Sequence, residues 1–259
     1  NGTSLYITQD IALLNKRLHG DSLCKGSDIV IYVTDFSQTL QFRQLFAIAH
    51  LLGIAQDSLH HIGYGAIRRK EGKMSSRKGN VVHADNLIQQ LEDLVHQTYF
   101  QDSGLDTSKI QSIARAAYMY YLVSTSAQKD MIFDEAASIS LEGKTGPYIL
   151  YTYARIRSLV GKSQVTSHVG NVYGFESERL LIMQAIEYFH MIDLTKRSFD
   201  PAILAHFLYE LSVVVNSYYH ETQVIGSEYE SERVALLDII SRILRNGLSL
   251  LAIDTLEEM

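Results

Sequence analysis

Apolar residues in the first part of the chain follow two different periods. The β-branched and aromatic run at 29–33 is bounded by polar turn residues and predicts a buried strand. Residues 39–52 carry apolar side chains at helical spacing, and residues 58–67 predict a second strand. Strand, helix and strand in this order form a βαβ unit, which implies a parallel sheet with a right-handed crossover.

From residue 83 onward the apolar pattern is almost entirely helical. Pro147 and Pro201 stand where a first helical turn tolerates proline, and Asp200 is a suitable capping residue. The last apolar stripe is expected to end at 246–247, because Asn-Gly is a common C-terminal helix signal. The pattern predicts an α/β part followed by an all-α part. We divide them as residues 1–105 and 106–259.

Composition narrows the class of protein. The 259 residues are 46% hydrophobic and 20% charged, which is ordinary globular usage and excludes disordered, collagen-like and disulfide-rich classes. Cys24 is the only cysteine, so a disulfide framework and a thiolate metal cage are excluded. The apolar stretch 45–55 is far shorter than the ~20 residues of a membrane span. We expect a cytoplasmic protein without a membrane partner or a protein-bound metal.

Charge and tyrosine are unevenly distributed. Residues 1–109 have no net charge, whereas residues 110–259 carry a net charge of −6 and 12 of the 16 tyrosines. The second part therefore cannot bind nucleic acid as a uniform cationic surface. Tyrosine offers stacking area without charge, as in the recognition of single-stranded RNA, although packing between helices is the better expectation for any single tyrosine.

A cationic loop follows the second predicted strand. Six basic side chains and one glutamate lie within residues 68–78. A solvated surface loop is the ordinary interpretation of such a run. Here Gly72 and Gly79 permit close approach of the backbone to a ligand, and ligands bind beyond the carboxyl ends of parallel strands. Cations at this place would stabilise charge on transferring phosphates.

The string Lys-Met-Ser-Ser-Arg at 73–77 resembles the KMSKS signature of class I aminoacyl-tRNA synthetases, and with 78–80 it is similar to the arginyl-tRNA synthetase version. Other blocks that resemble this family, in the expected order, are 1–12, 32–38, 141–155 and 233–259. The resemblance implies the second half of a Rossmann-type nucleotide-binding fold followed by an anticodon-binding helical bundle. It also implies a monomeric enzyme that activates arginine with ATP, accompanied by Mg²⁺, and transfers it to the 3′ end of tRNA(Arg).

The resemblance assigns roles in catalysis and ATP binding. Lys73 and Arg77 would be catalytic, because they would stabilise the departing pyrophosphate. The residues that would bind ATP are Lys73, Met74, Ser75, Ser76 and Arg77.

By the same resemblance, Tyr6, Asp10 and Gln38 would hold the amino acid. A carboxylate such as that of Asp10 can accept paired, charge-assisted hydrogen bonds from a guanidinium group. If Thr8 caps a helix, Tyr6 and Asp10 would lie close together at its start. From the residues alone, Asp10 is better explained as a favourable charge at a helix N-terminus without a ligand.

The resemblance implies that the helix carrying Tyr148, Tyr151 and Arg155 faces tRNA, and it adds Met259 as a further tRNA contact. Tyr148, Tyr151 and Arg155 lie at i, i+3 and i+7, which puts them on one face of this helix. Packing of the two tyrosines against a neighbouring helix is an equally good expectation.

Class I synthetases also carry a HIGH signature in the first half of the catalytic fold. The string His-His-Ile-Gly at 60–63 is superficially similar, but it lies about ten residues before the KMSKS-like loop, where the family has a strand of the sheet. Because no other such string occurs and residue 1 is Asn rather than Met, we expect a C-terminal fragment that does not activate arginine by itself. Two alternatives stay open: a non-catalytic tRNA-binding or assembly module, and a class I synthetase for another amino acid.

Overall fold

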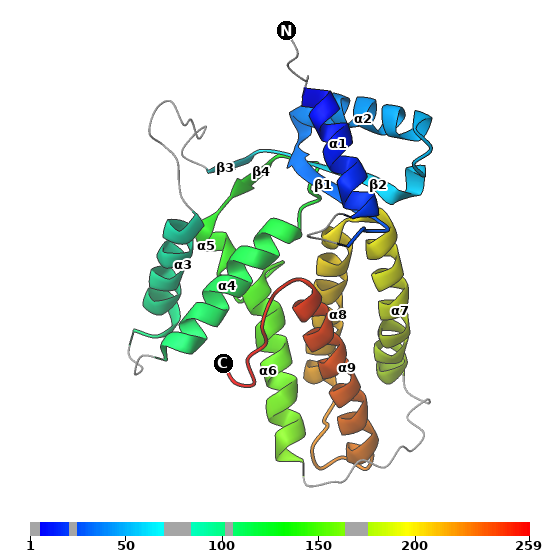
Figure 1. The fold of residues 1–259 in the computed structure, drawn as a ribbon. Coiled ribbons are helices and arrows are strands. Elements are labelled where there is room, and N and C mark those ends of the chain that lie inside the picture. The colour runs from blue at the N-terminus through cyan, green and yellow to red at the C-terminus, as the bar shows by residue number, and fades with distance from the viewer. Residues whose placement is uncertain (1–5, 21–24, 70–83, 102–105, 164–175) are drawn as a thin grey trace. The chain divides into compact units, whose positions relative to one another are not determined.

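Figure 1 shows the computed structural model, which describes residues 6–20, 25–69, 84–101, 106–163 and 176–259. The chain forms two compact units, residues 1–67 with 127–131 and residues 68–126 with 132–259. The border between these compact units differs from the domain boundary expected at 105–106. That domain boundary stays a prediction.

The first unit contains the predicted strand, helix and strand. In chain order its elements are α1 (Tyr6–His19), β1 (Val30–Asp35), the 3₁₀ helix η1 (Phe36–Gln38), α2 (Thr39–Leu51), the 3₁₀ helix η2 (Gln56–Ser58) and β2 (Leu59–Tyr64). β1 and β2 are parallel neighbours, which confirms the expected parallel pairing. α1 contacts both β1 and α2, so the two helices and the sheet share one core.

The two faces of this sheet differ. Val30 pairs with Leu59 in the register, and both side chains are buried in the core formed with α1 and α2. On the opposite face Ile31 and Val33 are 44% and 62% exposed. Within this unit the sheet has one packed face and one exposed apolar face. This is unusual, because parallel sheets are normally covered on both faces.

The predicted extent of the second strand, 58–67, is wrong. The chain leaves β2 and forms β3 (Ile67–Arg69), which pairs with β4 (Met131–Phe133) in a separate two-stranded sheet. At the break the Gly65 N–H donates to the Ala127 carbonyl oxygen at 2.7 Å. A Cβ on Gly65 would come within 2.6 Å of the facing backbone, so only glycine permits this approach. β4 was not predicted; it lies in the part of the chain where the apolar pattern is almost entirely helical.

The second unit is mainly helical. Its helices are α3 (Ala84–Tyr99), α4 (Thr107–Val123), α5 (Glu135–Ser138), α6 (Gly146–Lys162), α7 (Glu176–Ser198), α8 (Pro201–Glu221) and α9 (Glu230–Leu250). The predicted helix starts are confirmed: Thr145 caps α6 and Asp200 caps α8, each followed by proline in the first turn. α6 packs against α4, α8 and α9, and α7 packs against α8 and α9.

The predicted end of the last helix at 246–247 is wrong. α9 continues to Leu250, and the backbone turns at Ala252, whose φ is 58°. Gly247 lies inside the helix, where a Cβ would come within 2.5 Å of the Leu208 side chain. The glycine therefore allows α9 to approach α8 closely instead of ending α9.

A buried ion pair joins α7, α8 and α9. Glu178 is 0% exposed, and its Oε1 accepts hydrogen bonds from Arg233 Nε at 2.9 Å and from the Tyr218 hydroxyl at 3.0 Å. Burial by itself raises the pKa of Glu178. Hydrogen bonds from Ser177 and Tyr218 and the charge of Arg233 outweigh burial, so the pKa is lowered overall.

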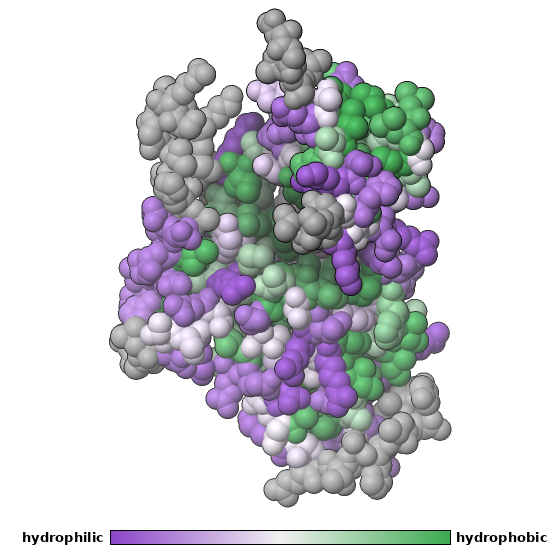
Figure 2. Space-filling view, in the orientation of Figure 1, coloured by the Kyte–Doolittle hydropathy of each residue, from purple (hydrophilic) through white to green (hydrophobic). Residues whose placement is uncertain are grey.

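Some apolar side chains of the second unit are exposed. Figure 2 shows them along α7, where Leu180, Met183, Ile186 and Phe189 are 52–73% exposed. Nevertheless, within the described part of the chain no helix is both long and apolar enough to cross a membrane.

Gly146→Ala is expected to lower the free energy of unfolding by about 1–3 kcal/mol, because overpacking follows when a Cβ is forced into filled space. That Cβ would lie 2.1 Å from the Ala116 carbonyl oxygen. Gly161→Ala, in the same helix, is the control because nothing lies within 4 Å of its Cβ position. Urea unfolding should show Gly161→Ala unchanged or up to about 1 kcal/mol more stable. Equal stability of the two variants would contradict the packing assigned to Gly146.

Glu178→Gln is expected to destabilise the protein by ~3–5 kcal/mol near neutral pH, since it leaves Arg233 without its buried counter-charge. The folded-state pKa of Glu178 lies below its ordinary value of 4.5, so the ion pair stabilises the fold fully above pH 4.5. The stability gap between wild type and variant should narrow as pH falls through the lowered pKa. Chemical unfolding across this range measures the gap, with the exposed Glu228→Gln as control. A gap independent of pH would exclude the ionised pair.

Candidate functional site

The structure brings the predicted amino-acid-binding residues of the first unit to the starts of α1 and α2. Tyr6 and Asp10 lie one turn apart in α1, and Thr8 lies inside this helix, so it is not the cap. Gln38 directly precedes α2. One turn further on, Gln41 Nε2 donates to Asp10 Oδ2 at 3.0 Å. The hydrogen bond fixes Asp10 of α1 beside the first turn of α2.

The surroundings of Asp10 suit a polar ligand. Tyr6 is 84% exposed, and Gln38 is exposed with a side chain that makes no capping hydrogen bond. Gln41 donates to one oxygen of the Asp10 carboxylate, and the second oxygen can accept from a planar cationic group. Sequence reasoning missed Gln41; the signal was its position three residues after Gln38, which places both at the start of one helix.

A cavity of ≈ 330 Å³ lies at the carboxyl ends of β1 and β2, where ligands of parallel sheets bind. The residues that line it are Phe36, Thr39, Arg43, Phe46, His61, Gly63 and Gln128. His61 stacks on Phe42 with ring centroids 4.5 Å apart, and burial lowers the pKa of His61. The His-His-Ile-Gly string lies in β2, which confirms a strand there. Sequence reasoning missed Arg43 and His61 as cavity residues.

The residues of the KMSKS-like loop are not among those that the structure describes. Lys73, Met74, Ser75, Ser76 and Arg77 lie outside the described residues, and their roles stay predictions. Among the residues that are described, no group of three or more His, Cys, Asp or Glu side chains is arranged to hold a metal ion.

In the second unit, three of the four predicted tRNA-contacting residues line one groove of ≈ 560 Å³. Its lining residues are Tyr151, Ala154, Arg155, Ser158, Leu159, Lys162, Tyr219, Ile225, Glu258 and Met259. Tyr151 and Met259 are 42% and 37% exposed, so each presents part of its side chain to a ligand. We call this surface the α6 groove.

Arg155 is held in a defined orientation in the α6 groove. Its guanidinium carbon lies 4.5 Å from the ring centroid of Tyr219, a cation–π arrangement. The Tyr219 hydroxyl donates to the Arg155 carbonyl oxygen at 3.1 Å, and burial raises the pKa of Tyr219 to about 12. Among the side chains that line the groove, those of Arg155 and Lys162 are cationic and that of Glu258 is anionic. Aromatic area beside cations suits an RNA strand.

Tyr148 does not line the α6 groove. Its ring centroid lies 5.5 Å from that of Tyr209, and its hydroxyl accepts a hydrogen bond from Asn216 at 3.0 Å. This placement fits the alternative in which Tyr148 packs between helices.

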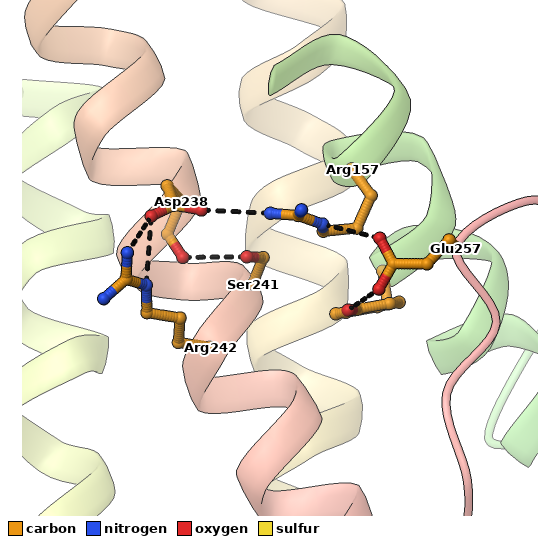
Figure 3. A network of polar contacts seen from close by, with 6 residues as sticks. Arg157, Asp238, Ser241, Arg242 and Glu257 are labelled. Carbon is orange, nitrogen blue, oxygen red and sulfur yellow. Dashed lines mark hydrogen bonds and ion pairs between the residues drawn. The ribbon is translucent and has the colours of Figure 1, made fainter. Parts of the chain in front are cut away.

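The segment after α9 is tied to α6 by a polar network (Figure 3). Glu257 accepts from the Tyr153 hydroxyl at 2.7 Å and from Arg157 Nε at 2.9 Å. Arg157 Nη1 also donates to Asp238 of α9 at 3.1 Å, and Asp238 accepts from Arg242 Nε at 3.0 Å. The hydrogen bond from Arg157, followed by that from Tyr153, lowers the pKa of Glu257.

Two family models match the chain, and the border between them differs from that between the two compact units. The family model for tRNA synthetases class I (R), catalytic domain, matches residues 1–133, and the model for the DALR anticodon binding domain matches residues 149–259. The chain is 32% identical to the arginine–tRNA ligase of Halobacterium salinarum over 268 residues and 33% identical to that of Borrelia hermsii over 273 residues. These alignments cover the whole chain but only 42% and 46% of the relatives, so the chain spans less than half their length.

The solved structure of Thermus thermophilus arginyl-tRNA synthetase has the same fold, with a TM-score of 0.90 at 22% identity over all of this chain and 50% of that one. The predicted fold class, a Rossmann-type part followed by an anticodon-binding helical bundle, is thereby confirmed. One family model covers more than half of the chain, and a second covers the helical bundle that carries the α6 groove. The chain belongs to the class I arginyl-tRNA synthetase family.

Proposed function

We propose that this chain is part of an arginine–tRNA ligase. The complete protein would join arginine to ATP with loss of pyrophosphate and pass the arginyl group from AMP to the 3′ end of tRNA(Arg). The observation that carries the proposal is the convergence of Tyr151, Arg155 and Met259 on one groove within the region matched by the anticodon-binding model. A monomeric state and a cytoplasmic location are parts of the same proposal.

In the first unit, Asp10 would recognise the guanidinium group of arginine. The fork of a guanidinium presents two parallel N–H donors, and a carboxylate accepts both with favourable charge. Gln41 holds the Asp10 carboxylate at 3.0 Å and so supports a fixed orientation before a ligand arrives. Tyr6 and Gln38, on the same helix starts, would contact the rest of the amino acid.

ATP, with its Mg²⁺, would bind beyond the carboxyl ends of β1 and β2. Lys73 and Arg77 would stabilise the negative charge that develops on pyrophosphate as the bond between the α- and β-phosphates breaks. Met74 would pack beside the adenine, and Ser75 and Ser76 would donate hydrogen bonds to phosphates. These five assignments come from the resemblance of the loop to the KMSKS signature.

In the second unit, the α6 groove would bind tRNA through unpaired nucleotides. Tyr151 offers a face for base stacking, and Arg155 and Lys162 offer cations for phosphates or bases. Met259 adds an apolar contact at the same groove. This arrangement explains how a unit with net negative charge could hold a polyanion, because the positive charge is concentrated where the aromatic surface lies.

Asp10→Asn in the complete enzyme should raise the KM for arginine about 10- to 100-fold, since a hydrogen bond to a charged group contributes ~1.5–3 kcal/mol. The KM for ATP should change little. Arginine-dependent ATP–pyrophosphate exchange measures both constants, and Asp57→Asn, an exposed carboxylate of the same unit, is the matched control. An unchanged arginine KM in Asp10→Asn would remove Asp10 from the pocket.

Tyr151→Ala should weaken tRNA(Arg) binding by about 1–3 kcal/mol, the usual loss when one base-stacking side chain is removed. Fluorescence anisotropy with labelled tRNA measures the affinity. Phe189→Ala removes an aromatic ring that is 73% exposed on α7 and does not line the groove, so it should leave the affinity unchanged. Equal affinities for wild type and Tyr151→Ala would exclude stacking at this residue.

A further inference from the structure

Residues 251–259 leave α9 and reach the α6 groove without regular secondary structure. The first part of this segment is held by burial: Leu251 and Ile253 are 5% and 1% exposed, and the Ile253 N–H donates to the Leu248 carbonyl oxygen at 2.9 Å. Leu256 is still partly buried and packs against the apolar cluster of α3 and α4, whereas residues 257–259 are exposed. Another kind of contact must hold the last residues in place.

Glu257 makes that contact with both of its oxygens. Tyr153 donates to Oε1 and Arg157 to Oε2, so the carboxylate is gripped by two side chains one turn apart on α6 (Figure 3). Charge-assisted bonds of this kind are about twice as strong as neutral ones. We call these three side chains the Glu257 clamp.

Tyr153 and Arg157 are also held in place by contacts that do not involve Glu257. Tyr153 is 1% exposed and packed in the core, and Arg157 is also bound to Asp238 of α9. Asp238 is in turn bound to Arg242. Because Tyr153 and Arg157 are already ordered by these partners, little side-chain freedom is lost when they receive Glu257.

α6 carries the clamp and the groove on adjoining faces. At 100° per residue, Ala154 and Ser158 stand between the clamp pair 153 and 157 and the groove pair 151 and 155 on the helix circumference. Ala154 and Ser158 themselves line the groove, together with Glu258 and Met259. Glu258 and Met259 therefore border the same groove as these two small side chains, and the hydrogen bonds to Glu257 restrict where these next two residues lie.

We propose that Glu257 is a positioning residue for RNA binding: the grip of Tyr153 and Arg157 on Glu257 holds Met259 in the α6 groove, where Met259 forms part of the surface for a nucleotide base. The proposal rests on the proposed function, because it supposes that the α6 groove binds tRNA. Without the clamp, the cost of ordering Glu258 and Met259 falls on the binding step, which lowers affinity although neither residue has changed.

The experiment compares variants of the complete protein by two readouts. The first is the ¹³C-methyl NMR signal of Met259 without RNA, identified by its loss in Met259→Leu, and the second is the affinity for tRNA(Arg). Glu257→Ala should move the Met259 signal to the position of a solvent-exposed methionine and weaken tRNA binding about tenfold. Glu257→Gln, which keeps one acceptor oxygen but neither the second acceptor nor the charge, should restore part of both. Asp254→Ala removes an exposed ion pair with Arg115 (4.0 Å) in the same segment and should change neither, because exposed ion pairs contribute little.

A double-mutant cycle separates positioning from a general loss of structure. If Glu257 acts through Met259, then Glu257→Ala combined with Met259→Ala should bind tRNA no more weakly than the weaker single variant. Fully additive losses would overturn the proposal, and so would an unchanged Met259 signal in Glu257→Ala. If Tyr151→Ala weakens tRNA binding but Glu257→Ala does not, the positioning role of Glu257 is overturned. The proposed function would not be affected by that result. Absence of tRNA binding by the wild-type protein would instead overturn the proposed function and the RNA-binding role of the clamp together.

Discussion

The close packing of α6 is the constraint on which the second unit depends. Its side chains at 149, 150, 152, 153 and 156 are at most 1% exposed, and it packs against α4, α8 and α9. Gly146 lets its first turn approach the backbone of α4. A helix held on so many sides has a fixed rotation about its axis. That rotation decides which of its polar side chains reach solvent, and so it defines the groove.

Electrostatics in this unit depends on placement more than on net charge. Glu178 and Arg233 face each other inside the core, where each would be costly alone. Arg155 and Lys162 lie together at the groove, although acidic residues outnumber basic ones in this part of the sequence. The same residue types therefore stabilise the fold in one place and form a candidate ligand surface in another, according to what lies around them.

Local signals in the sequence predicted the elements well, and contacts between distant residues decided the rest. Proline and capping residues located the starts of α6 and α8, because those signals act within one helical turn. A glycine such as Gly247 can either end a helix or permit close helix packing, and the local sequence is the same in both cases. The contact with Leu208 on another helix shows that close packing is the reason here.

The candidate site residues were likewise predicted in part from the sequence, and contacts between distant residues decided the rest. Family resemblance selected Tyr148 and Tyr151 together, but Tyr209 and Asn216 on α8 draw only Tyr148 into the bundle. Asp10 was a candidate from the sequence, whereas its hydrogen-bond partner Gln41, 31 positions later, required the fold to be known. The contacts around Glu257 also depend on segments that no local pattern connects.

The exposed face of the β1–β2 sheet has a consequence for handling the first unit in isolation. Ile31 and Val33 present β-branched side chains to water on a strand whose described ladder involves β2 alone. Such a strand is a template on which other chains can add, so self-association is the hazard if this unit is produced by itself. Lysine substitutions at these two positions, a device by which natural sheets block edge-to-edge growth, would be the first means of keeping it monodisperse.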